Sequence, residues 1–241
     1  WLGDLVTGTA LMRETMAPGQ RSQGILQTRD GKGRLVADSH PDGGSRGLVQ
    51  MKEGGSVRDF GSGAVLQMMR TLNNGRLQRG VVEVPESGSI SDALMVYFQE
   101  SEQVASMVAM GTLLDGDEVR VAGGYIVQLL PELAEGPLMV MTERLKDFER
   151  IEALLKGPET TPDSMLEELL YGMPYTRLDE TPLRFECRCS EMRLLETLAT
   201  LPKSDIEEMM NDGTPLEITC DYCLTEYRFA PERLRGMLQR S

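Results

Sequence analysis

The four cysteines of the chain form two close pairs near its carboxyl end, a C-x-C pair and a C-x-x-C pair separated by thirty residues, namely Cys187, Cys189, Cys220 and Cys223. Four thiolates presented by two tight turns can complete the tetrahedral coordination of a structural zinc ion. The same thiolates can be oxidised, and partners one or two residues apart can then form local disulfides. The spacing therefore predicts a Zn²⁺ site. It leaves open whether the zinc is permanently structural or part of a redox switch.

The segment that carries the cysteines, residues 187–241, has only 55 residues and few large apolar side chains. Domains of this size are only marginally stable without a disulfide or a bound metal ion. Structural zinc contributes about 10–16 kcal/mol of apparent binding energy in small peptides. We therefore expect a zinc-binding module that unfolds when the metal is removed. Its expected elements are a helix from Ser190, a helix capped by Ser204, strands at 216–219 and 225–229, and a last helix at 233–238.

Residues 157–186 differ in composition from the rest of the chain, with four prolines and seven acidic residues against two basic ones. We interpret this segment as an acidic linker with one helix, capped by Thr161, with Pro162 at its first position and Gly172 as its stop. Short helices are marginal in water, so this one needs a neighbour to cover its apolar stripe of Met165, Leu166, Leu169 and Leu170.

Residues 1–156 are predicted to form an α+β domain, a two-layer arrangement of helices on an antiparallel sheet. Asp30-Gly31 predicts the turn of a hairpin between strands at 24–27 and 34–37. Further strands are expected at 47–51, 64–69 and 80–84, and helices at 1–16, from Ser89, and at 137–155. The long apolar segments 104–114 and 119–130 are expected to be central strands of an antiparallel sheet.

The charge balance argues against nucleic acid as a partner, because 25 Lys+Arg against 38 Asp+Glu give a net charge of −13, which repels phosphate backbones. No apolar stretch approaches the roughly 18 residues of a membrane span, and no secretory signal is visible. We expect no membrane association and a cytoplasmic location.

Other short motifs are weaker. Residues 43–47 match G-x-S-x-G around Ser45, yet the hydrolase elbow needs a following helix and a later histidine, whereas the sole histidine is His40. The glycines at 61–63 lack a phosphate-loop ending, and 115–118 reads as a hairpin tip rather than a calcium loop. Thioredoxin-like exchange is disfavoured because neither cysteine pair opens a helix after a strand. We expect no catalytic residues and no enzyme activity.

The order of these parts resembles the thirty-three-kilodalton heat-shock protein family, the redox-regulated bacterial holdase chaperones. The resemblance includes the C-x-x-C pair followed by Tyr-Arg-Phe at 227–229, Arg46-Gly47 after a hairpin, Ala122-Gly-Gly-Tyr125, and Phe185 to Ser190 around the C-x-C pair. It covers essentially the whole chain except the family's usual opening strand and helix, so we expect an amino-terminally shortened member.

The resemblance implies a mechanism. In reductant the four cysteines would bind zinc and keep the linker docked. Oxidation would form the disulfides Cys187–Cys189 and Cys220–Cys223, expel zinc and unfold the module. The loosened linker would then expose apolar surface that binds unfolding client proteins without ATP, in a protein that is a homodimer when oxidised. Client-binding candidates are Met141, Leu145, Met165, Leu166, Leu169 and Leu170.

Two other functions compete with this one. An interaction module with a permanently structural zinc site would keep its metal under oxidation. A hydrolase would depend on Ser45.

Overall fold

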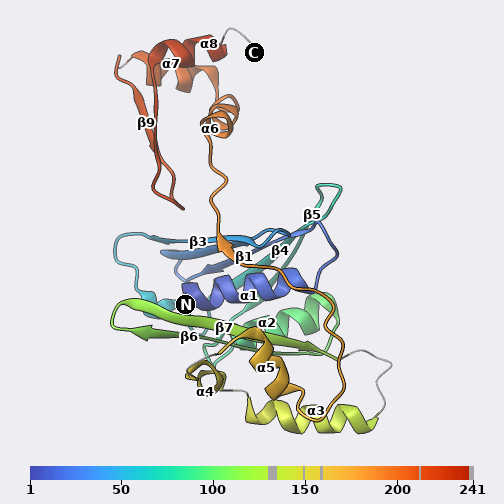
Figure 1. The fold of residues 1–241 in the computed structure, drawn as a ribbon. Coiled ribbons are helices and arrows are strands. Elements are labelled where there is room, and N and C mark those ends of the chain that lie inside the picture. The colour runs from blue at the N-terminus through green and yellow to red at the C-terminus, as the bar shows by residue number, and fades with distance from the viewer. Residues whose placement is uncertain (130–134, 149, 158–159, 212, 239–241) are drawn as a thin grey trace. The chain divides into compact units, whose positions relative to one another are not determined.

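The computed structural model describes residues 1–241 except 130–134, 149, 158–159, 212 and 239–241, with the backbone alone described at 135–138, 210–211 and 236–238. The chain divides into two compact units, Trp1–Phe185 and Glu186–Ser241. Both mix helices with antiparallel strands (Figure 1). The prediction of an α+β fold with an antiparallel sheet is confirmed.

A six-stranded sheet forms one layer of the first unit. Its strands follow the order β5-β4-β1-β2-β3-β8 and are antiparallel, except that β8 runs parallel to β3. The expected hairpin is β1–β2, and Gly31 in its turn has a φ of 70°, the left-handed conformation that glycine adopts without strain. The strands are β1 (Arg21–Gln27), β2 (Gly33–Ser39), β3 (Gly44–Met51), β4 (Val65–Thr71), β5 (Leu77–Glu83) and β8 (Arg184–Phe185).

Arg46-Gly47, one of the segments that carry the family resemblance, places two adjacent residues of β3 in contact with neighbouring elements. Arg46 lies opposite Asp38 in the β2–β3 register, and its Nε donates to the buried Asp38 carboxylate at 3.0 Å. A Cβ at Gly47 would lie 2.9 Å from both Leu2 and Val6. The pair therefore serves helix packing on one face and pairs a buried charge on the other.

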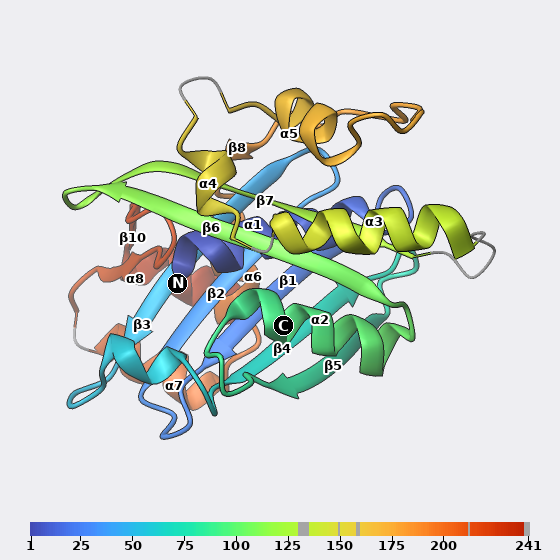
Figure 2. The ribbon, with the colours of Figure 1, turned by 90° about the horizontal axis from the view of Figure 1, so that it is seen from below.

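Two helices, α1 (Leu2–Glu14) and α2 (Ile90–Tyr97), pack between this sheet and a separate hairpin of β6 (Ser106–Asp115) and β7 (Glu118–Gln128). The Ser89 side chain caps α2 as expected, accepting from the N–H of Asp92. Short helical turns lie at Val57–Phe60 (η1) and Phe98–Glu102 (η2). Figure 2 shows the hairpin crossing α1. The main core of the unit includes Leu5, Met12, Leu26, Leu66, Met68, Leu94 and Phe98.

Segments 104–114 and 119–130 form an antiparallel strand pair as expected, but the expectation that they are central strands was wrong. They pair with each other and, among the described residues, join no strand of the six-stranded sheet. Both faces of the hairpin are nevertheless covered: Val108 and Met110 face the main core, whereas Ala109 and Tyr125 face a second apolar cluster. A strand covered on both faces has the continuous apolar sequence of a central strand.

Three helices cover the outer face of the hairpin: α3 (Glu135–Asp147), α4 (Glu152–Leu155) and α5 (Pro162–Leu169). The single helix expected at 137–155 is therefore two. The Tyr125 hydroxyl donates to the carbonyl of Phe148 at 3.2 Å, which satisfies a group that the interrupted helix leaves free. Within the described residues, no helix is long and apolar enough to cross a membrane.

The second unit contains α6 (Glu191–Leu198), α7 (Lys203–Asn211), the antiparallel pair β9 (Leu216–Thr219) and β10 (Glu226–Phe229), and α8 (Pro231–Leu238). The helix predicted to begin at Ser190 is α6, and the Ser190 side chain caps it by accepting from the N–H of Arg193. The predicted cap at Ser204 was wrong, because α7 begins at Lys203, so the cap position is Pro202, two residues before Ser204. Among the described residues, the buried apolar side chains of its core cluster are Leu198, Ile206, Phe229 and Leu234.

Candidate metal centre

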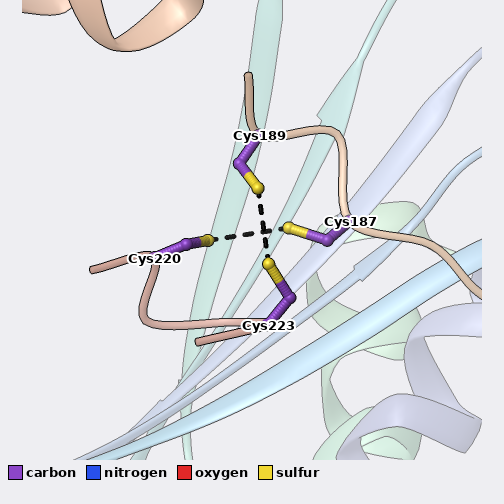
Figure 3. A group of neighbouring side chains, drawn as sticks. All are labelled: Cys187, Cys189, Cys220 and Cys223. Atoms are coloured by element: carbon purple, nitrogen blue, oxygen red, sulfur yellow. Dashed lines mark hydrogen bonds between the residues drawn. The ribbon is translucent and has the colours of Figure 1, made fainter. Parts of the chain in front are cut away.

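The four cysteine sulfurs converge on one point in the second unit (Figure 3). All four lie within 4.8 Å of one another. Cys187 Sγ lies 3.7 Å from Cys220 Sγ, and Cys189 Sγ lies 3.3 Å from Cys223 Sγ. The arrangement brings together two segments far apart in the chain, as four-sulfur coordination of one metal ion requires.

The C-x-x-C turn between β9 and β10 has its own backbone bonds. The N–H of Cys220 donates to the carbonyl of Thr225 at 2.9 Å, and the N–H of Leu224 donates to the carbonyl of Cys220 at 2.8 Å. Leu224 has a φ of 59°, a left-handed conformation that is uncommon for a bulky residue. This tight reversal places both sulfurs of the turn on the same side.

Two hydroxyl groups contact the sulfurs. Tyr227 Oη donates to Cys189 Sγ at 3.1 Å, and Thr225 Oγ1 lies 3.2 Å from Cys223 Sγ. Neither residue has a role predicted from the sequence, although Tyr227 belongs to the Tyr-Arg-Phe segment. A usable signal was present: alternate residues of a strand share a face, so the buried Phe229 places Tyr227 on the inner face of β10.

The thiol groups of the cluster differ in pKa. Hydrogen bonds from the hydroxyl and then the backbone of Thr225 lower the pKa of Cys223 to about 6. The pKa of Cys189 is raised to about 12: the hydrogen bond from Tyr227 opposes this rise, which burial and the neighbouring thiols produce. Four adjacent thiols resist losing all their protons, because each thiolate makes the next less favourable. A divalent cation would remove that repulsion, and thiolate sulfur is a donor that zinc prefers.

The six residues considered for client binding lie on α3 and on or next to α5, in the first unit. Leu145, Met165 and Leu169 are buried in one apolar cluster with Ile151 and Leu155 of the α4 region, and Met141 and Leu170 pack against it. Leu166 is half-buried and is not among the described members of this cluster.

The linker helix is held by specific contacts. Its start carries a capping box, with Ser164 N–H donating to Thr161 Oγ1 at 3.1 Å and Thr161 N–H donating to Ser164 Oγ at 2.9 Å. Past its end, the guanidinium of Arg144 from α3 donates to the carbonyl of Tyr171 and lies 5.6 Å from the centre of the Tyr171 ring. Met165, Leu169 and Leu170 of the linker are packed against other apolar side chains of the first unit.

The weaker motifs fall in turns and strands. Ser45 lies in β3 rather than before a helix, and its Oγ lies 3.2 Å from Ser39 Oγ. His40 belongs to the β2–β3 turn, where its carbonyl accepts from the N–H of Gly43 at 3.0 Å. The predicted hairpin tip at 115–118 is confirmed, with Gly116 at a φ of 61°.

Known proteins resemble this chain over both units. A sequence model of the family described as "Hsp33 protein" matches residues 1–230. The "33 kDa chaperonin" of Lachnoclostridium phytofermentans is 32% identical over 262 residues, covering 100% of this chain and 85% of the relative. The protein of the same name from Syntrophotalea carbinolica is 31% identical over 247 residues, covering 98% and 85%. The crystal structure of the 33 kDa chaperonin (heat shock protein 33 homolog) from Thermotoga maritima superposes with a TM-score of 0.81 at 26% identity, covering 99% of this chain and 84% of that one.

Proposed function

The chain belongs to the Hsp33 family of chaperones, and from this premise we propose that it is an ATP-independent holdase activated when its cysteines are oxidised. The observation that carries the proposal is the convergence of four sulfurs within 4.8 Å in a unit with few buried apolar side chains. So small a core gives little stability of its own. The unit therefore depends on groups that an oxidant can modify.

In the resting state, Cys187, Cys189, Cys220 and Cys223 would hold Zn²⁺ as thiolates. Zinc supplies folding free energy rather than reactivity in a closed four-sulfur site. The protein's part is to present two sulfurs from the segment before α6 and two from the β9–β10 turn. Loss of either pair breaks the connection between these segments.

Oxidation would join Cys187 to Cys189 and Cys220 to Cys223. Formation of each disulfide transfers two electrons from the two thiolates to the oxidant. With hydrogen peroxide, two thiolates, one peroxide and two protons give one disulfide and two waters. Two close sulfur contacts in the folded unit, Cys187–Cys220 at 3.7 Å and Cys189–Cys223 at 3.3 Å, cross between the two segments. The local pairs are favoured once the unit opens, because cysteines one or two residues apart stay close in an unfolded chain.

The link to client binding runs through the chain itself. Cys187 follows strand β8 by two residues, and β8 is held on β3 by the Arg184 N–H, which donates to the carbonyl of Gly43 at 3.1 Å. We expect unfolding of the metal unit to loosen this short strand and then α5. The apolar surface so exposed would comprise Met141, Leu145, Met165, Leu166, Leu169 and Leu170, and it would bind unfolding proteins.

The remaining features of the proposal follow the family and the composition. The oxidised form is proposed to be a homodimer, and the protein to act in the cytoplasm. Nucleic acid is not proposed as a partner, given the net charge of −13. Membrane association is likewise not proposed.

One experiment separates the candidate functions. Zinc-loaded protein is treated with hypochlorite, or with peroxide at elevated temperature, while zinc release and the light scattering of an unfolding client are followed together. Release with suppressed aggregation supports the chaperone. Release without suppression overturns it, and retention of zinc would establish the permanently structural site. Esterase turnover lost in Ser45→Ala would instead identify a hydrolase.

A further inference from the structure

We infer that Tyr227 is a positioning residue of the sulfur centre: its hydroxyl holds Cys189 in the ligand position and retards both metal loss and oxidation at that sulfur. The inference deepens the proposed function and rests on it for the metal and for the oxidation. It concerns a hydroxyl that is not itself a ligand.

The protonation of the two groups fixes which of them donates the hydrogen bond. Tyr227 Oη lies 3.1 Å from Cys189 Sγ. A metal-bound thiolate has no proton to give, so the phenol must donate. Hydrogen bonds to an ionised acceptor are stronger than those between neutral groups. The bond therefore strengthens when Cys189 is deprotonated to bind metal.

The fold holds the phenol in place independently of the metal. Tyr227 pairs with Ile218 across the β9–β10 ladder, and its ring packs against the core cluster that contains the fully buried Phe229. The ring is thus fixed by packing while its oxygen reaches Cys189, 38 positions away in sequence. Tyr227 joins the C-x-C segment to the hairpin, as a bound metal ion would.

The second hydroxyl contact differs in kind and serves as the comparison. Thr225 contacts Cys223, only two residues away, within the same turn. It can support the local conformation of the turn but cannot connect the two segments. Tyr227 is therefore the hydroxyl whose loss should affect assembly of the whole site.

The same bond has a chemical consequence during oxidation. Cys189 thiolate attacks peroxide to give the sulfenic acid and hydroxide, and Cys187 thiolate then displaces a second hydroxide to form the disulfide. Two electrons leave the two sulfurs and one peroxide is reduced. A donated hydrogen bond withdraws charge from the attacking sulfur and slows the first step, so removing it should speed oxidation.

The test is Tyr227→Phe, which keeps the packed ring and removes the hydroxyl. Partners that orient a metal ligand typically change metal affinity by about 10–100-fold, and we expect a loss of zinc affinity in this range, measured in reductant against a chromogenic chelator. Peroxide-driven zinc release should also be faster. Tyr175→Phe, a half-exposed tyrosine of the linker, should behave as wild type.

A spectroscopic readout separates positioning from general support. In the cobalt-substituted protein, loss of the hydrogen bond makes the Cys189 sulfur more electron-rich, so the sulfur-to-cobalt charge-transfer band should move to lower energy in Tyr227→Phe but not in Tyr175→Phe. In wild-type protein loaded with an NMR-active cadmium isotope, the Tyr227 hydroxyl proton should couple to the metal through sulfur. This second measurement needs no variant to fold.

These experiments distinguish failure of the inference about Tyr227 from failure of the proposed function. If wild-type protein binds no zinc, the proposed function and this inference both fail. If wild type binds and releases zinc while Tyr227→Phe matches it in affinity, release rate and cobalt spectrum, the inference alone is overturned. Absence of the hydroxyl coupling to cadmium would also overturn it.

Discussion

Gly111 and Gly123 lie directly opposite each other in the β6–β7 hairpin, and both lie beneath the α4 region. A Cβ at Gly111 would lie 2.9 Å from Ile151 Cγ2, and one at Gly123 would lie 3.1 Å from Leu155 Cδ2. Ile151 and Leu155 belong to the cluster that also buries the linker residue Met165. This cross-strand pair of glycines therefore lets α4 approach the hairpin closely enough to form the surface on which the linker packs.

Gly111→Ala should loosen that surface. The added methyl group meets the branched, buried Ile151, and overpacking of this kind costs about 1–3 kcal/mol. We expect an earlier urea midpoint for the first unit and faster amide exchange in α5. Gly123→Ala is the matched comparison, because it meets only the end of the flexible Leu155 side chain and should cost less. Equal midpoints for Gly111→Ala and wild type would contradict the close approach.

The parts of the fold that follow from the sequence are those encoded locally. The β1–β2 turn, the cap at Ser89, the helix beginning at Ser190 and the start of α5 at Pro162 depend on residues within a few positions of one another. All were predicted. The four-cysteine cluster was predicted for a related reason, since close pairs of the same ligand are visible in sequence.

The parts that were missed depend on contacts between distant residues. The helix expected at 137–155 is interrupted between α3 and α4. At the interruption, the Tyr125 hydroxyl donates a hydrogen bond to the carbonyl of Phe148. The β6–β7 hairpin has the sequence of a central strand pair because helices cover both of its faces. The bond from Tyr227 to Cys189 spans 38 positions, beyond the range of any short motif.

Thr161→Val should lower the oxidant or temperature threshold for activation. It removes the acceptor of the capping box, and loss of such a cap costs about 0.5–2 kcal/mol. Because α5 has only eight residues, fraying at its start should loosen its packing. The measurement is client aggregation against temperature at fixed peroxide, and Thr161→Ser should restore wild-type behaviour. A threshold unchanged in Thr161→Val would separate α5 from activation.

Arg144→Gln should raise chaperone activity in reductant. Arg144 joins α3 to the second residue after the linker helix, through the Tyr171 carbonyl and ring. An exposed cation–π contact alone contributes about 0.5–1 kcal/mol. Partial release of this end should expose Leu170 and Leu169 without oxidation. Client light scattering at equal protein concentration is the measurement. Arg150→Gln, at an exposed position between α3 and α4, is the control, and identical curves for both variants would exclude a holding role for Arg144.

Cys220→Ser should disconnect the second unit from its metal while leaving the first unit folded. Three sulfurs bind zinc less tightly than four, and the core around Phe229 and Leu234 is too small to replace the lost free energy. Amide exchange in reductant should therefore show rapid exchange in α6 and β9 and unchanged protection in β1 and β2. Adding a strong chelator to wild-type protein should reproduce the same pattern. If the amides of β9 and β10 remain protected in both experiments, the second unit is stable without metal, and oxidation of the cysteines could not act by unfolding it.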